Sequence, residues 1–319
     1  MRRLLLLIVL VFYASGALAQ EAGCVVSADP LPYFNKVLSK SKSVAQKFYR
    51  KNTVATLYPA TALRVQGRVD VVARRGNPLA TPEALADGAV LHLGDVLQTY
   101  EQSFISLRLG DGTVSTLPSN SRIELARSSR SVARFVLQKG TVESGVRKND
   151  AARKNTFEIQ IPNAIVGVRG THFRVHYEQN YSTAEVSDGT VWVQPRHVDV
   201  CHAPLVIKAG EGARLDNLSG VVAAYLLPAP QLIGQENAQK NELVAFTVAP
   251  VAGAVRYHAQ VAADEGFLDV QTEVFSDSPN VVLKDESLRN GFYYVKLTAI
   301  DETGLEGLAG SYLFLRARE

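Results

Sequence analysis

The chain has 319 residues, of which 46% are hydrophobic and 20% are charged, with a formal net charge of +3. These values are typical of a globular protein and argue against collagen, coiled-coil and largely disordered classes. So small a net charge disfavours a nucleic-acid binder recognised by overall basicity. The two cysteines are too few for a disulfide-built scaffold or a cysteine-rich zinc site.

Residues 1–19 have the pattern of a secretory signal peptide. Arg2 and Arg3 precede an apolar run over residues 4–13, and Ala17-Leu18-Ala19 places small residues at a cleavage site. The run is shorter than the roughly 20 residues of a spanning helix, which disfavours an uncleaved anchor. We therefore expect an exported protein of the periplasm or cell envelope, with no transmembrane segment after signal removal. Losing Arg2 and Arg3 lowers the net charge by two, to +1.

Export permits a disulfide, and Cys24 with Cys201 is the one available pair. We predict that they form one intramolecular bond, which the loop-entropy model credits with about 5 kcal/mol at most. The alternative is two buried free thiols. A lipid anchor on Cys24 is disfavoured because Glu21 occupies a place where such signals have an aliphatic residue.

Residues 20–66 form a basic N-terminal segment. Between Lys36 and Arg75 there are ten basic residues and one acidic residue. Residues 57–65 resemble the closing stretch of a LysM peptidoglycan-binding module, but the opening half is missing, so no ligand-binding residue is carried over. A cluster of bases within about a Debye length attracts a polyanion more than a single lysine does. The candidate binding residues here are Lys40, Lys42, Lys47, Arg50, Lys51 and Arg64.

Residues 67–215 have the pattern of a many-stranded all-β domain. Ile105, Leu107 and Leu109 alternate with polar residues, and residues 173–177 repeat the alternation. Asp188-Gly189 is a tight hairpin signal. We expect short strands separated by glycine turns.

Several spaced motifs in this region resemble the FecR domain. They are Gly67-Arg68-Val69, Gly94-Asp95-Val96-Leu97-Gln98-Thr99, Ser106-Leu107-Arg108-Leu109, Asp111-Gly112-Thr113, Phe135-Val136-Leu137, Gly140-Thr141-Val142, Phe157-Glu158-Ile159, Pro162-Asn163-Ala164, Val166-Gly167-Val168-Arg169-Gly170-Thr171-His172-Phe173, Thr183-Ala184-Glu185-Val186, Gly189-Thr190-Val191-Trp192-Val193 and Gly210-Glu211. The resemblance implies the periplasmic half of a membrane regulator that receives a signal and controls a sigma factor. Only three residues precede the apolar leader, so we expect no cytoplasmic anti-sigma segment.

Arg169 lies between Gly167 and Gly170, in the most specific of these motifs. The two glycines permit backbone conformations or a close strand approach that a β-carbon would forbid. Arg169 is then either an ion-pair partner of an acid on a neighbouring strand or an exposed binding group. We add it to the candidate binding residues.

The C-terminal third begins after a break. Residues 216–232 read as a linker that contains Pro228-Ala229-Pro230. Residues 233–319 have a second β pattern, with a long alternating strand over residues 291–301. This part resembles fibronectin type III-like sandwiches, with Val248 where a core tryptophan often lies.

The sequence has no Gly-x-Ser-x-Gly elbow, Walker loop, His-Glu-x-x-His helix or dinucleotide-binding glycine signature, and we expect no enzyme activity, no cofactor and no metal. The alternative is a glycosidase carboxylate pair, which is recognised by distance and not by sequence. His172 and His176 on one strand are roughly 13 Å apart, too far to share one ion. Four carboxylates lie beside turn glycines, where we expect them to bond local backbone N–H groups. They are Asp95, Asp111, Glu143 and Asp188.

Charge is distributed unevenly. From Asp264 to Glu319 there are eleven acidic and five basic residues, the reverse of the N-terminal balance. The sequence therefore predicts a non-catalytic binding or scaffold protein of the envelope that contacts peptidoglycan or another anionic wall polymer. The alternative is a periplasmic accessory or signalling protein that binds another envelope protein through its FecR-like domain. No nucleic-acid partner is expected.

Overall fold

The computed structural model describes residues 59–318, except 129–131, 148–155, 169, 197–203, 217–219, 235–237 and 284–287. Over these residues the secondary structure is all strands and turns, which confirms the all-β prediction. None of the described elements is a helix that could span a membrane. The described residues all belong to one compact unit, Thr56–Val198 with His202–Glu319.

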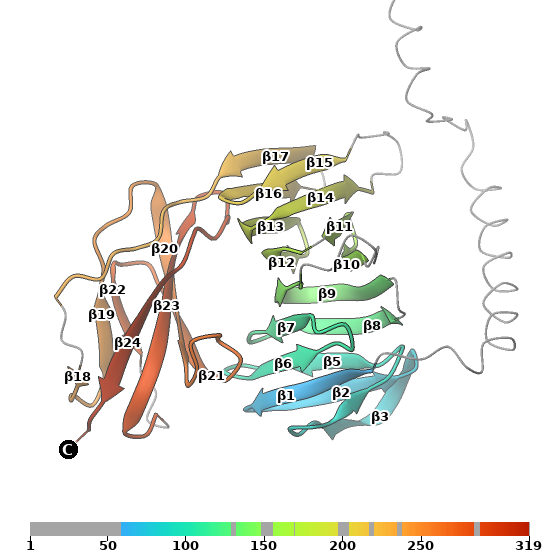
Figure 1. Cartoon of the computed structure of the whole chain (residues 1–319), viewed down its shortest axis with the longest axis horizontal. Coiled ribbons are helices and arrows are strands. Elements are labelled where there is room, and N and C mark those ends of the chain that lie inside the picture. The colour runs from blue at the N-terminus through green and yellow to red at the C-terminus, as the bar shows by residue number, and fades with distance from the viewer. Residues whose placement is uncertain are drawn as a thin grey trace, which may run out of the picture. The chain divides into compact units, whose positions relative to one another are not determined.

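Two sheets form the first part of the structure. The first sheet, in spatial order, consists of β4 (Val90–Leu91), β1 (Ala60–Gln66), β6 (Phe104–Arg108), β7 (Val114–Leu117), the second half of β9 (Val132–Gly145), β12 (His172–Glu178), β13 (Tyr181–Asp188), β16 (Glu211–Asp216) and β17 (Gly220–Tyr225). The second sheet consists of β3 (Asn77–Ala84), β2 (Val69–Arg74), β5 (Val96–Thr99), β8 (Arg122–Ser128), the first half of β9, β10 (Thr156–Ile161), β11 (Ala164–Val168), β14 (Thr190–Pro195) and β15 (Leu205–Lys208). Figure 1 shows these strands stacked from β1–β3 to β15–β17.

A continuous apolar core fills the space between these two sheets. It is built by the alternation seen in the sequence, since Phe173 and Val175 point inward while His172 is exposed. Phe157 lies edge-on to both Phe135 and Phe173, at 5.8 and 6.2 Å between ring centroids. These three rings come from β10, β9 and β12, so they connect the two sheets across the core.

β9 belongs to both sheets, and Gly140 is where it crosses. Lys139 pairs with Arg122 in the second sheet, whereas Gly140 pairs with Tyr177 in the first. Gly140 has φ +81°, and a β-carbon there would lie 2.5 Å from the Ser121 hydroxyl oxygen. That hydroxyl accepts a hydrogen bond from the Thr141 N–H at 3.0 Å. The crossing therefore needs a residue without a side chain.

Pairing extends beyond the predicted bounds of the FecR-like region at both ends. β1 lies in the segment predicted as the basic N-terminal part, yet it pairs with β6 and buries Ala60 and Ala62 in the core. β17 lies in the predicted linker, yet it pairs along its whole length with β16. Neither strand shows the strict alternation of apolar and polar residues that marks strands elsewhere in the chain, so the sequence did not delimit them.

The C-terminal strands form two further sheets. The larger consists of β18 (Ala238–Gln239), β24 (Gly310–Arg316), β23 (Gly291–Asp301), β20 (Ala254–Ala262) and β21 (Val270–Ser276), and the smaller of β19 (Val244–Thr247) and β22 (Asn280–Leu283). Both contribute to one core, in which Phe246 lies edge-on to Phe314 at 5.1 Å. Val248 is buried in that core. The arrangement is a two-layer sandwich, and its likeness to fibronectin type III remains a prediction.

We predict that Gly140→Ala lowers the free energy of unfolding by about 2–3 kcal/mol, because the new methyl group meets Ser121 in a left-handed backbone conformation. Gly145→Ala is the matched control, since it lies on the same strand with nothing within 4 Å of an added β-carbon. Urea unfolding of both variants measures the difference. Equal stabilities for the two variants would contradict the assignment of Gly140 as the crossing point.

Candidate functional site

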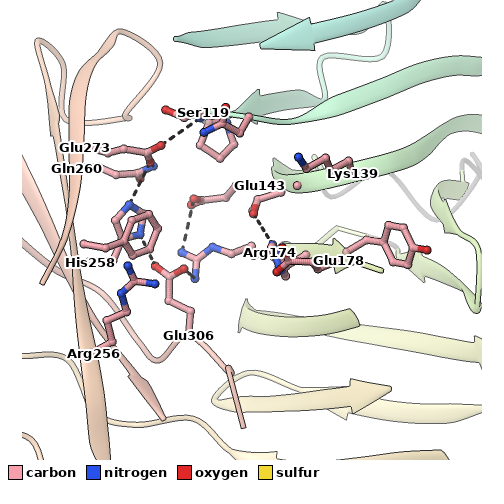
Figure 2. Close-up of a pocket in the computed structure, with 17 residues that line it drawn as sticks. Ser119, Lys139, Glu143, Arg174, Glu178, Arg256, His258, Gln260, Glu273 and Glu306 are labelled. Atoms are coloured by element: carbon pink, nitrogen blue, oxygen red, sulfur yellow. Dashed lines mark hydrogen bonds and ion pairs between the residues drawn. The ribbon is translucent and has the colours of Figure 1, made fainter. Parts of the chain in front are cut away.

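A cleft of about 450 Å³ lies where the first sheet meets the C-terminal sandwich. One wall comes from β9 and β12 with the turn before β8, and the other from β20, β21 and the loop that holds Glu306 (Figure 2). Ionisable side chains from both walls meet at its base. Their geometry decides what the cleft can do.

Arg174 lies at the centre of this base. Its Nη1 is 3.0 Å from Glu306 Oε2 in the sandwich, and its Nη2 is 3.7 Å from Glu143 Oε2 on the neighbouring strand β9. Burial alone would lower the pKa of Arg174, but Glu306 and Glu143 outweigh it and raise the pKa above its ordinary value. The guanidinium is therefore a permanent charge between two carboxylates (Figure 2).

His258 extends the chain of charges into the sandwich. Its Nδ1 lies 2.9 Å from Glu306 Oε1 and its Nε2 lies 3.1 Å from Glu273 Oε2. Burial lowers the pKa of His258, but the two carboxylates more than compensate and raise it to about 9. Burial likewise favours neutral Glu306, yet Arg174 and His258 hold its pKa well below the ordinary range. At neutral pH the imidazole is a cation that donates to both carboxylates.

Glu143 joins the network on the other side. Its Oε2 accepts a hydrogen bond from Lys296 Nζ at 2.8 Å, and its Oε1 lies 3.0 Å from His172 Nε2. Burial would raise the pKa of Glu143, but Lys296, His172 and Arg174 together place it well below its ordinary value. The expectation that Glu143 serves a local turn is therefore wrong, because its partners come from β12 and from the sandwich.

Glu185 is the one carboxyl group of this cluster that is not fully paired. It is 4% exposed, its Oε1 accepts a bond from the Glu306 N–H at 3.4 Å, and its Oε2 has no partner among the described residues. Burial raises the pKa of Glu185 to about 7, although Arg174 opposes the shift. It lines a second cavity of about 580 Å³ beside Arg174 and Lys296.

The rim of the first cleft carries the groups that solvent can reach. Phe275 stacks on His258 at 4.1 Å between ring centroids, and the Arg256 guanidinium lies 4.7 Å above the Phe275 ring. Lys139 and Glu178 lie across from them (Figure 2). Arg256 and Lys139 are the cations that a ligand entering the cleft would meet first.

The chemistry available in the cleft is electrostatic. Three of its carboxylates accept hydrogen bonds in ion pairs: Glu143, Glu273 and Glu306. Because the pKa of each is lowered, they are ionised near neutral pH and cannot act there as general acids. Among the described residues no group of three or more histidine, cysteine or acidic side chains is placed to hold a metal ion.

Most of the predicted binding residues lie outside the described part of the chain. These are Lys40, Lys42, Lys47, Arg50, Lys51 and Arg169, together with Cys24 and Cys201 of the predicted disulfide. Arg64 is described: it lies on β1 with its Nη1 2.9 Å from Asp87 Oδ2 and its Nε 3.6 Å from Asp269 Oδ2. An exposed ion pair thus engages the Arg64 side chain.

The remaining sequence expectations have mixed outcomes. Asp111 accepts the Thr113 N–H at 2.9 Å, as predicted for a turn carboxylate. Asp95 accepts the His92 N–H but also binds Arg74 at 2.7 Å. Gly167 pairs with Trp192, and a β-carbon on Gly167 would lie 1.9 Å from the indole, so the predicted close approach is confirmed.

One comparison with known proteins matches a stretch of the two-sheet part. Residues 95–192 match the family model described as FecR protein. The match supports the FecR resemblance of this region, and we call the two-sheet part, β1–β17, the FecR part. The LysM-like and fibronectin-like resemblances remain predictions. No curated protein matches the sequence.

Among solved structures, we report two that are similar to this chain at low sequence identity. One is a candidate anti-sigma factor from Parabacteroides distasonis ATCC 8503, at 19% identity and TM-score 0.35, covering 41% of this chain and 59% of that chain. This chain therefore spans less than two thirds of that protein's length. The other is the extracellular domain of a candidate one-component system from B. thetaiotaomicron, at 9% identity and TM-score 0.19, covering 67% of this chain and 30% of that chain.

We predict that the free energy of unfolding of Glu185→Gln, compared with that of the parent, increases as pH rises. The pKa of this carboxyl is about 7 in the folded state against an ordinary 4.5, so between these values the folded protein holds a proton that the unfolded chain has released. Stability is therefore lost as pH rises through that window. The gain of the variant over the parent should grow by about 2.5 kcal/mol between pH 5 and pH 8.

Urea unfolding at pH 5 and pH 8 measures this change, with Glu178→Gln as the control on an exposed carboxyl of the same sheet. The control should show no such growth. A Glu185→Gln variant whose advantage is the same at both pH values would contradict the assignment.

Proposed function

We propose that the protein is a non-catalytic exported envelope protein that acts as a binding or scaffold module. One observation carries this proposal: the ionisable groups at the base of the cleft are bound to each other, across the joint between the FecR part and the sandwich. Glu143 binds Lys296 and Arg174 binds Glu306, so the side chains that could do acid–base work fasten the two parts together. Such pairing supports a structural role for the joint and leaves recognition to outer surfaces.

For the ligand we propose an anionic envelope polymer such as peptidoglycan, contacted by the basic N-terminal segment. The support is the cluster of bases over residues 40–51. Five bases fall within these twelve positions of the sequence, and charges within a Debye length of one another, about 8 Å at physiological salt, act jointly on a polyanion. Arg64 is a weaker contributor than its neighbours, because Asp87 already engages it.

We predict that reversing the N-terminal cluster to glutamate weakens sacculus binding of the full mature chain at least about tenfold at low salt, and that rising salt weakens the parent. The reversed bases are Lys40, Lys42, Lys47, Arg50 and Lys51. The matched control reverses five exposed bases of the described part and so changes the net charge equally: Arg108, Arg127, Lys208, Lys240 and Arg289.

Pull-down on purified sacculi measures both variants. The proposal requires the control to bind as the parent does. If the N-terminal variant binds as well as the parent, the N-terminal contact is wrong.

A second candidate function is a periplasmic accessory or signalling protein that binds another envelope protein through the FecR domain. The match of residues 95–192 to the FecR family favours it. In that case sacculi retain neither parent nor control, and cross-linking in the envelope captures a protein partner instead. Reversal of Arg169, in the most specific FecR motif, would then weaken capture while the N-terminal reversal would not.

A further inference from the structure

The two sheets of the FecR part have four outer edges, and three of them resist further pairing. β3 carries Pro78, Pro82 and Glu83, β4 has only two residues, and β15 is a four-residue strand that carries Lys208. Prolines, charges and short length are the usual means of blocking an edge. β17 has none of them: its sequence is Gly-Val-Val-Ala-Ala-Tyr, over six residues.

The backbone of β17 has unused hydrogen-bonding groups on its outer side. Within the described part of the chain β17 pairs only with β16. The Leu226 N–H donates to the Gly210 carbonyl at 2.9 Å, just beyond the Tyr225–Glu211 pair. That pair is therefore of the non-hydrogen-bonded type, and Tyr225 directs its own N–H and C=O away from β16. Hydrogen-bonded and non-hydrogen-bonded pairs alternate along the ladder, so Val221 and Ala223 also direct their N–H and C=O groups away from β16.

The side chains of the same three residues leave the end of the core open. Val221 and Ala223 lie opposite Leu215 and Ala213, which are both buried in the core between the sheets. Tyr225, two residues further along this face, is 83% exposed. On the opposite face Val222 is 58% exposed. An added strand would thus complete a hydrogen-bond ladder and cover apolar surface at once.

We propose that β17 pairs antiparallel with β17 of a second copy of this chain, about a two-fold axis at Ala223. This register places Tyr225 of one copy against Val221 of the other, a large ring beside a smaller side chain, with the smallest pair on the axis. All three cross-strand pairs are then of the hydrogen-bonded type, which supplies about six backbone bonds.

The second copy is favoured over a foreign strand because β17 is complementary to itself. It has no charge to repel its own image, and its outward N–H and C=O groups at residues 221, 223 and 225 match under the two-fold operation. The joined first sheets would form one continuous sheet across the dimer. This inference goes beyond the proposed function and does not depend on it.

The contact between the two β17 strands, which we call the seam, is short, and its length limits the affinity of the dimer. Six residues span about 20 Å, so the buried area lies at the low end for stable complexes. We therefore expect a dimer that forms in the micromolar range and dissociates on dilution.

Sedimentation equilibrium of the mature full chain from about 1 to 200 µM tests the proposal. The parent should shift from monomer to dimer. Ala223→Lys places two like charges across the axis and should weaken dimerisation at least about tenfold. Ala223→Pro removes only an outward N–H, so the monomer should keep its fold, shown by an unchanged thermal midpoint, while dimerisation is lost.

Val255→Lys is the matched control, because Val255 is 54% exposed on β20 and lies outside the seam. It should dimerise as the parent does. A parent that stays monomeric over the whole range, or one that dimerises with Ala223→Pro matching its dissociation constant, would overturn the proposal.

Discussion

The buried ion pair between Arg174 and Glu306 is the interaction on which the joint between the FecR part and the sandwich depends. Arg174 lies on β12 of the FecR part, and the carboxylate that it binds most closely, Glu306, belongs to the C-terminal sandwich. A buried guanidinium without its partner would cost several kcal/mol, so each part supplies the charge that the other needs. Lys296 and Glu143 repeat this exchange in the opposite direction, with the cation in the sandwich and the anion in the FecR part. Each part therefore supplies one cation and one anion to the joint.

Apolar contact at this joint includes one small cluster of buried residues. Phe104 of β6 packs with Phe267 and Val270 of the sandwich in a cluster of four buried residues. Around it, neutral hydrogen bonds fix the register: Gln102 binds the backbone of Glu273 in both directions, and the Ser106 hydroxyl donates to the Leu268 carbonyl at 2.6 Å. Bonds of this kind are directional, whereas apolar burial is not. The joint is thus specified mainly by polar groups, while each part is stabilised by its own apolar core.

The sequence predicted what local pattern determines. Strict alternation at residues 105–109 and 173–177 predicted strands, and the spaced FecR motifs predicted the family of the region that the family model matches. The crossing of β9 between the sheets was not predictable in the same way, because a glycine within residues 132–145 does not by itself mark a crossing, and only the contact of Gly140 with Ser121 shows it. The charged cluster was missed for a related reason. Glu143 and Lys296 are 153 positions apart, and nothing near Glu143 in the sequence marks a distant partner. A cue did exist: alternation places Glu143, Arg174 and Glu185 at polar positions of strands, where three charges at register positions of adjacent strands indicate a buried network.

The central claim is that charge pairs across the joint make the FecR part and the sandwich one cooperative unit. Differential scanning calorimetry of residues 20–319, with Arg174→Met beside the parent, tests it most directly. The parent should unfold in a single transition whose calorimetric and van't Hoff enthalpies agree. Arg174→Met leaves Glu306 without its guanidinium partner and should separate the unfolding of the two parts into two transitions. Two independent transitions in the parent, or a single unchanged transition in Arg174→Met, would contradict the account.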